Sequence, residues 1–120
     1  MPPSVLAATT DLFLQSRISE IAKAQGFEAK FVKGDEMIQA VKESSPRLVV
    51  LDLSSNDDAP FTIAEALKAS SPSLKIFGFY PHVRTELKAR AESSGIDYVV
   101  PNSSFTRSLK NILASQKVTG

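Results

Sequence analysis

Five short apolar segments alternate along the chain with segments whose apolar residues recur every three or four positions. The short segments are Ser4–Thr9, Phe27–Val32, Leu48–Leu53, Lys75–Tyr80 and Asp97–Val100. They are rich in Val, Ile, Leu and Phe and are bounded by Gly, Pro, Ser or Asp, which predicts β-strands. The first, third and fourth are nearly continuous apolar runs, as expected for strands that helices cover on both faces.

The segments between them have the periodicity of amphipathic helices. In the first, Leu14, Ile18 and Ile21 share one face, while Asp11 is placed to start the helix and Gly26 to end it. Four more helices are predicted, from Met37, Ile38 and Val41; from Ile63, Ala64 and Leu67; from Val83, Leu87 and Ala91; and from Phe105, Leu109, Ile112 and Leu113 behind a Ser103–Ser104 cap. Five strand–helix pairs predict right-handed crossovers and a parallel α/β sheet. We expect a single domain over residues 1–120, with a frayed tail at 116–120.

Composition and charge narrow the chemistry that this fold can carry. Fourteen Lys and Arg residues against 13 Asp and Glu leave a net charge of +1. The chain therefore lacks the excess of basic residues that a nucleic-acid or membrane-surface partner would require. The chain has no cysteine and one histidine, His82, which excludes thiolate chemistry and metal sites with two imidazoles. No apolar run approaches the roughly 20 residues of a membrane span, and the first residues lack the charged region of a secretory signal. We therefore expect a cytoplasmic protein.

Open α/β sheets bind ligands beyond the carboxyl ends of their strands, at the point where the strand order reverses. Asp52 is the most distinctive residue there, because it closes the apolar run Leu48–Leu51. Taken alone, such an aspartate is more simply explained as a cap for the following loop. The other residues that follow strands are Thr9, Thr10 and Asp11 after the first, Tyr80, Pro81 and His82 after the fourth, and Pro101 and Asn102 after the fifth.

The overall pattern resembles the receiver domain of two-component response regulators over nearly the whole chain. Residues 5–11 (VLAATTD) stand where that family has an apolar strand that ends in an acidic pair, and Gly26-Phe27 lies at its spacing for the step into the second strand. Residues 46–52 (PRLVVLD) are similar to its run into the phosphoacceptor aspartate, and residues 95–100 (GIDYVV) to its approach to the fifth strand. The resemblance implies a flavodoxin-like (CheY-like) doubly wound sheet of five parallel strands in the order 2-1-3-4-5, with helices on both faces.

The active site of the receiver family carries over only in part. Asp52 matches the aspartate that accepts a phosphoryl group. In an ungapped alignment the acidic pair falls on Thr9 and Thr10, neither of which is a carboxylate. A shift of one residue would bring Asp11 into the second acidic position, but it spoils the register to Gly26.

The switch residues of the family are also replaced. The Thr or Ser that senses the phosphoryl group falls on Tyr80, and the Lys that pairs with it falls on Pro101. The proline that follows this Lys falls on Asn102, unless the Lys is deleted and Pro101 takes the proline position. Tyr98 matches the aromatic switch position in the fifth strand.

These replacements remove most of the charge that phosphoryl transfer to a carboxylate requires. The family uses Mg²⁺ held by clustered carboxylates to bring two anions together, whereas two threonines offer hydroxyl oxygens without charge. We therefore expect a degenerate receiver, or pseudo-receiver, that is not an enzyme and needs no cofactor or metal. Mg²⁺ would be needed only if Asp52 is phosphorylated. The alternatives are an active receiver phosphorylated on Asp52 and, less favoured, a small hydrolase that uses Thr9 or Thr10, His82 and Asp52.

The resemblance implies a protein partner, either a histidine kinase, an output protein or a second copy of the chain. We expect it to dock on the fourth helix, the fifth strand and the fifth helix, where Tyr80 and Tyr98 would shape the surface. Alternation along the fourth strand places Phe77 and Phe79 on one face of the sheet and Gly78 and Tyr80 on the other. No nucleic-acid or membrane partner is expected.

Overall fold

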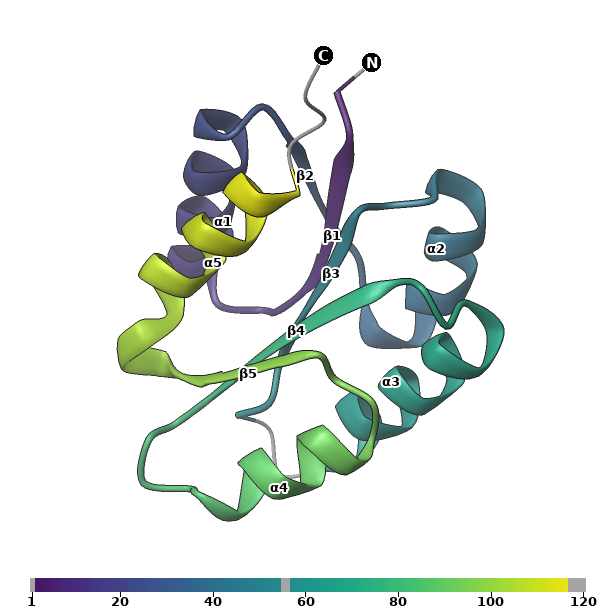
Figure 1. Cartoon of the computed structure of the whole chain (residues 1–120), viewed down its shortest axis with the longest axis vertical. Helices are drawn as coiled ribbons and strands as arrows, with labels where there is room; N and C mark the ends of the chain where they lie inside the picture. Colours follow the sequence, from purple (N-terminus) through teal and green to yellow (C-terminus); the bar gives the residue numbers. More distant parts are fainter. Residues whose placement is uncertain (1, 55–56, 117–120) are drawn as a thin grey trace.

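A computed structural model describes residues 2–54 and 57–116, which form a five-stranded parallel sheet between two layers of helices (Figure 1). The strands are β1 (Ser4–Ala8), β2 (Glu28–Phe31), β3 (Leu48–Asp52), β4 (Lys75–Tyr80) and β5 (Tyr98–Pro101). The helices are α1 (Leu12–Ala24), α2 (Met37–Ser44), α3 (Ala59–Ser70), α4 (Glu86–Ser93) and α5 (Phe105–Ser115), with short 3₁₀ turns η1 (Gly34–Glu36) and η2 (Asn102–Ser104).

The strand order is β2-β1-β3-β4-β5, and each neighbouring pair is parallel. This confirms the predicted architecture. The three apolar runs form the three inner strands β1, β3 and β4, and every residue of β4 after Lys75 is buried. The edge strands β2 and β5 are only partly buried. Inner strands pack against helices on both faces, so both sides of their pleat must be apolar.

The helices divide the core into two layers. Helices α1 and α5 cover one face of the sheet, and α2, α3 and α4 cover the other (Figure 1). On the first face Phe105 packs edge to face against Phe77 and Phe79, with ring centroids 5.8 and 4.7 Å apart. Gly78 and Tyr80 point to the second face, as alternation predicts. A Cβ at Gly78 would lie 3.0 Å from Cδ1 of Leu53, so glycine allows that leucine to close the core.

The first helix begins and ends where the sequence predicts. The Asp11 carboxylate accepts hydrogen bonds from the backbone N–H groups of Phe13 (2.9 Å) and Leu14 (3.2 Å), which have no partner within the helix. Gly26 follows α1 with a φ of +83°, a left-handed conformation that favours glycine. Both ends of α1 could be predicted from the sequence, because the cap at Asp11 and the turn at Gly26 each depend only on residues that are close in sequence.

Several boundary predictions were wrong. Ser104 makes no side-chain capping bond, because η2 runs directly into α5 and the N–H of Phe105 bonds to the carbonyl of Asn102. Val83 lies outside α4 and is 74% exposed, since a turn in which the Arg84 N–H bonds to the Pro81 carbonyl precedes the helix. The fifth strand is shifted by one residue, to Tyr98–Pro101.

Two further observations concern membrane-spanning helices and the end of the chain. Within residues 2–54 and 57–116, no helix combines the length and the apolar character needed to cross a membrane. Most of the predicted frayed tail, residues 117–120, lies outside the described residues, while Gln116 directly follows α5 as its C-cap.

Candidate functional site

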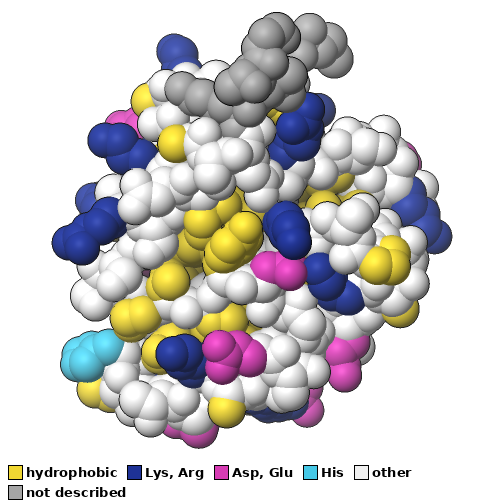
Figure 2. All heavy atoms as spheres, in the orientation of Figure 1, with side chains coloured by type: hydrophobic (Ala, Val, Ile, Leu, Met, Phe, Trp, Pro, Cys, Tyr) yellow, Lys and Arg dark blue, Asp and Glu magenta, His cyan; other side chains and the backbone are white. Residues whose placement is uncertain are grey.

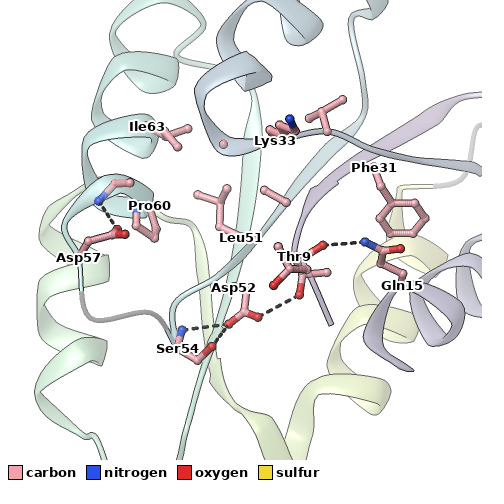
Figure 3. Close-up of a pocket in the computed structure, with 15 residues that line it drawn as sticks. Thr9, Gln15, Phe31, Lys33, Leu51, Asp52, Ser54, Asp57, Pro60 and Ile63 are labelled. Carbon is pink, nitrogen blue, oxygen red and sulfur yellow. Dashed lines mark hydrogen bonds between the residues drawn. The ribbon is translucent and has the colours of Figure 1, made fainter. Parts of the chain in front are cut away.

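Asp52 is the last residue of β3 and is half-buried at the carboxyl edge of the sheet. One carboxylate oxygen accepts a hydrogen bond from the Thr9 hydroxyl at 3.0 Å (Figure 3). The other oxygen accepts from the backbone N–H of Ser54 at 2.9 Å and from the Ser54 hydroxyl. Both oxygens are therefore bound by uncharged donors of the protein itself, and the carboxylate stabilises the turn that follows the strand.

Thr9 connects Asp52 to the loop between β1 and α1. Its hydroxyl accepts from the Asp11 N–H at 3.2 Å, and its backbone carbonyl accepts from Nε2 of Gln15 at 2.8 Å. Sequence reasoning did not identify Gln15. The available signal was a polar residue in the first turn of α1, where a long side chain can reach back to the loop.

Asp11, which a shifted alignment would make the second carboxylate, caps α1 and is not among the residues that line the pocket beside Asp52. Its Oδ1 atom caps α1, as described above, and the residue is exposed. In the part of the chain that the structure describes, no group of three or more Asp, Glu, His or Cys side chains is placed to hold a metal ion. Thr9 and Thr10, which stand where the receiver resemblance implies an acidic pair, bring hydroxyl oxygens without charge.

Tyr80 and Pro101 end β4 and β5 side by side, paired in the sheet register. The expectation that Tyr80 shapes a docking surface is wrong, because its side chain is 6% exposed and packs in the core beneath α3 and α4. Tyr98 is half-buried and packs on the opposite face, against the core covered by α1 and α5. The ends of β4 and β5 thus present packed rings where a receiver has a hydroxyl and an ammonium group.

The three residues of the hydrolase hypothesis do not form a triad. A triad requires an imidazole between the hydroxyl and the carboxylate, but the Thr9 hydroxyl donates directly to Asp52. His82 is exposed in the turn between β4 and α4, and no hydrogen bond joins it to either residue. Thr10 is also exposed, and it lines a pocket beside Asp52.

This pocket has a volume of about 640 Å³ and lies between the end of β2, the η1 turn and the start of α3 (Figure 3). Its charged lining residues are Lys33, Asp52 and Asp57. Sequence reasoning missed Lys33, which follows the edge strand β2, although the implied strand order already placed that strand beside β1. Gly34 allows the close approach of η1 to α3, since a Cβ there would lie 3.1 Å from Cδ1 of Ile63.

Comparisons with known proteins find similarity in structure rather than in sequence. Neither a protein-family model nor a curated protein matches the chain. A response regulator from Thermotoga maritima superposes with a TM-score of 0.79 over 97% of this chain and 100% of its own, at 12% identity. The receiver domain of the Francisella response regulator 1452 gives a TM-score of 0.78 at 19% identity, covering 95% of this chain and 98% of its own.

The chemotaxis response regulator CheY4 of Vibrio cholerae is similar to the same extent. Its TM-score is 0.77 at 13% identity, and the match covers 93% of this chain and 99% of that chain. At identities this low, the superpositions establish only the arrangement of strands and helices. The chemistry of the edge has to be argued from the residues described above. This chain has the fold of the receiver domains of response regulators.

Proposed function

We propose that this protein is a receiver-like signalling module of the two-component type that acts in the cytoplasm by binding protein partners. It catalyses no reaction and does not use Mg²⁺-dependent phosphorylation. The observation that carries this proposal is the state of the two aspartates at the edge: Asp52 is bound by Thr9 and Ser54, and Asp11 caps α1. The similarity to receiver domains supports the signalling class.

Electrostatics at the edge support the same proposal. An incoming phosphoryl donor and the Asp52 carboxylate are both anionic, so their approach needs a cation to offset the repulsion. Thr9 and Thr10 bring no charge, and Pro101 has no side-chain donor at all. Within the described residues, the cation that lines the pocket is Lys33, which follows β2 rather than β5.

We propose the surface formed by α4, β5 and α5 as the docking face for a histidine kinase, an output protein or a second copy. β5 is an edge strand, and all four of its residues are half-buried. Figure 2 shows hydrophobic side chains gathered in the middle of this face, over β4 and β5. An edge strand with unpaired backbone groups and partly exposed apolar side chains offers both hydrogen bonds and apolar area to a partner.

A phosphodonor experiment tests the proposal directly. The full chain is incubated with Mg²⁺ and acetyl phosphate, and its intact mass is measured beside that of Asp52→Asn. We expect both masses to stay unchanged. A gain of one phosphoryl group in the wild type that is absent in Asp52→Asn would overturn the proposal in favour of an active receiver.

A further inference from the structure

The pocket beside Asp52 lies where sheets of this order bind small molecules. β1 and β3 are neighbours in the sheet. From β1 the chain continues to β2, toward one edge of the sheet, and from β3 it continues to β4, toward the other edge. Ligands of open α/β folds bind at the carboxyl ends of the strands at this reversal. The volume of about 640 Å³ also lies within the range of roughly 300–1,000 Å³ that is typical of small-molecule sites.

The inner wall of the pocket is apolar. Leu51, Pro60 and Ile63 line it although they are almost fully buried, and the half-buried side chains of Phe31 and Val32 line it as well (Figure 3). Apolar surface that faces a pocket instead of a packed side chain favours a ligand with an apolar body.

Charged groups of both signs line the same pocket. Asp52 accepts hydrogen bonds from Thr9 and Ser54, and Asp57 accepts one from the Ala59 N–H at 2.9 Å. These donors are neutral. Among the described residues, no Lys or Arg forms an ion pair with either aspartate, and no carboxylate forms one with Lys33. A carboxylate has about four acceptor sites and an ammonium three donors, so all three groups keep capacity for a charged ligand.

We infer that this pocket binds a small zwitterion with an apolar body, the chemistry of an apolar amino acid or a short apolar peptide. The ligand carboxylate pairs with Lys33, its ammonium group with Asp52 and Asp57, and its side chain covers the apolar wall. The inference rests on the proposed function, because it gives the module an input that needs no phosphoryl chemistry. Such a ligand joins the ends of β2 and β3 to the start of α3.

Calorimetric titration of the full chain tests this assignment with matched probes. Leucine, phenylalanine and the dipeptide Leu-Leu carry both charges, isoamylamine and phenethylamine lack the carboxylate, and isocaproate and phenylpropionate lack the ammonium group. We expect at least one zwitterion to bind about tenfold more tightly than its truncated analogues, the equivalent of roughly 1.4 kcal/mol for each lost ion pair. Tighter binding of the free amino acids or of the dipeptide identifies which source of this chemistry the pocket prefers.

Two charge-removing variants connect the binding to the pocket. Lys33→Gln should abolish the preference for a zwitterion over the corresponding amine. Asp57→Asn should reduce the preference over the corresponding acid, while its amide oxygen can still accept from the Ala59 N–H. Lys30→Gln is the matched control, because Lys30 is exposed on β2 and does not line the pocket.

Three results would overturn the inference: no binding by any zwitterion, equal binding of the amines, or Lys33→Gln behaving like Lys30→Gln. These outcomes are separable from a failure of the proposed function. Phosphorylation of Asp52 together with zwitterion binding would overturn the proposed function alone. Absence of both phosphorylation and binding would overturn the ligand assignment alone.

Discussion

The two halves of the carboxyl edge of the sheet differ sharply. At the ends of β1 and β3 the edge is polar and open, with Asp52 bound by Thr9 and Ser54 beside a pocket. At the ends of β4 and β5 the edge is packed, with Tyr80 buried next to Pro101. The backbone arrangement is that of a receiver in both halves, so the volume and polarity of a few side chains decide whether an edge becomes a site or an extension of the core.

The packed half should be the more sensitive to truncation. Phe79→Ala should lower the free energy of unfolding by about 3–5 kcal/mol, because it removes a ring that is 1% exposed and packs on Phe105. Chemical denaturation measures this loss. Phe13→Ala is the control, since Phe13 is 89% exposed and its truncation should change stability by less than about 0.5 kcal/mol. Similar losses in the two variants would contradict this comparison.

Tyr80→Thr restores the small hydroxyl residue that the receiver resemblance implies at this position. We expect it to cost about 2–4 kcal/mol, because it leaves a cavity in the core beneath α3 and α4. Tyr80→Phe keeps the ring and should cost less than about 1 kcal/mol. If Tyr80→Thr unfolds at the same denaturant concentration as the wild type, the description of the β4–β5 half as packed core is wrong.

Substitutions at Asp52 measure how much the open half contributes to stability. Asp52→Ala leaves the Ser54 N–H and the Thr9 hydroxyl without their acceptor, at an expected cost of about 1–2 kcal/mol. Asp52→Asn keeps one oxygen for the Ser54 N–H, while the Thr9 hydroxyl can turn to accept from the new amide. It should therefore stay within about 1 kcal/mol of the wild type. Equal losses in the two variants would show that the negative charge itself stabilises this half.

The smallest expected effect is a shift in the pKa of Glu86, the first residue of α4. The pKa of Glu86 is lowered from its ordinary value of 4.5 by its own backbone N–H and then by the Arg84 side chain, which donates to it at 3.0 Å. A lowered folded-state pKa stabilises the fold above the unfolded value, and that contribution disappears as the pH falls through the folded value. In Arg84→Gln, an NMR titration should show the Glu86 midpoint moving upward. An unchanged midpoint would assign the shift to the backbone alone.

Much of the fold was predictable because its signals are local. The apolar runs of β1, β3 and β4 identified the inner strands, and Asp11 and Gly26 marked the ends of α1. The start of α4 was not predictable from periodicity, since Val83 continues the apolar pattern although it lies in an exposed turn. Helical spacing describes which residues could share a face, but not where the first helical hydrogen bond forms.

The candidate site was predictable only in part, for a related reason. Asp52 was identified because a carboxylate at the end of an apolar strand is conspicuous, and Thr9 because it follows the neighbouring strand. Lys33 was missed because it follows an edge strand, and Tyr80 was assigned to the surface although it is buried. Spacing predicted that Tyr80 ends a strand, but the depth of its ring depends on helices that are distant in sequence.

The sequence by itself determined the parallel α/β sheet and the identity of the residues at its carboxyl edge. Hydrophobic period and turn residues act between near neighbours, and the ends of parallel strands must meet at one edge. The tertiary structure decided which of those residues meet: it joined Thr9 to Asp52, used Asp11 as a helix cap, buried Tyr80 and brought Lys33 to the pocket. These outcomes depend on strand order and on side-chain volumes packed across the sheet, which no local pattern encodes.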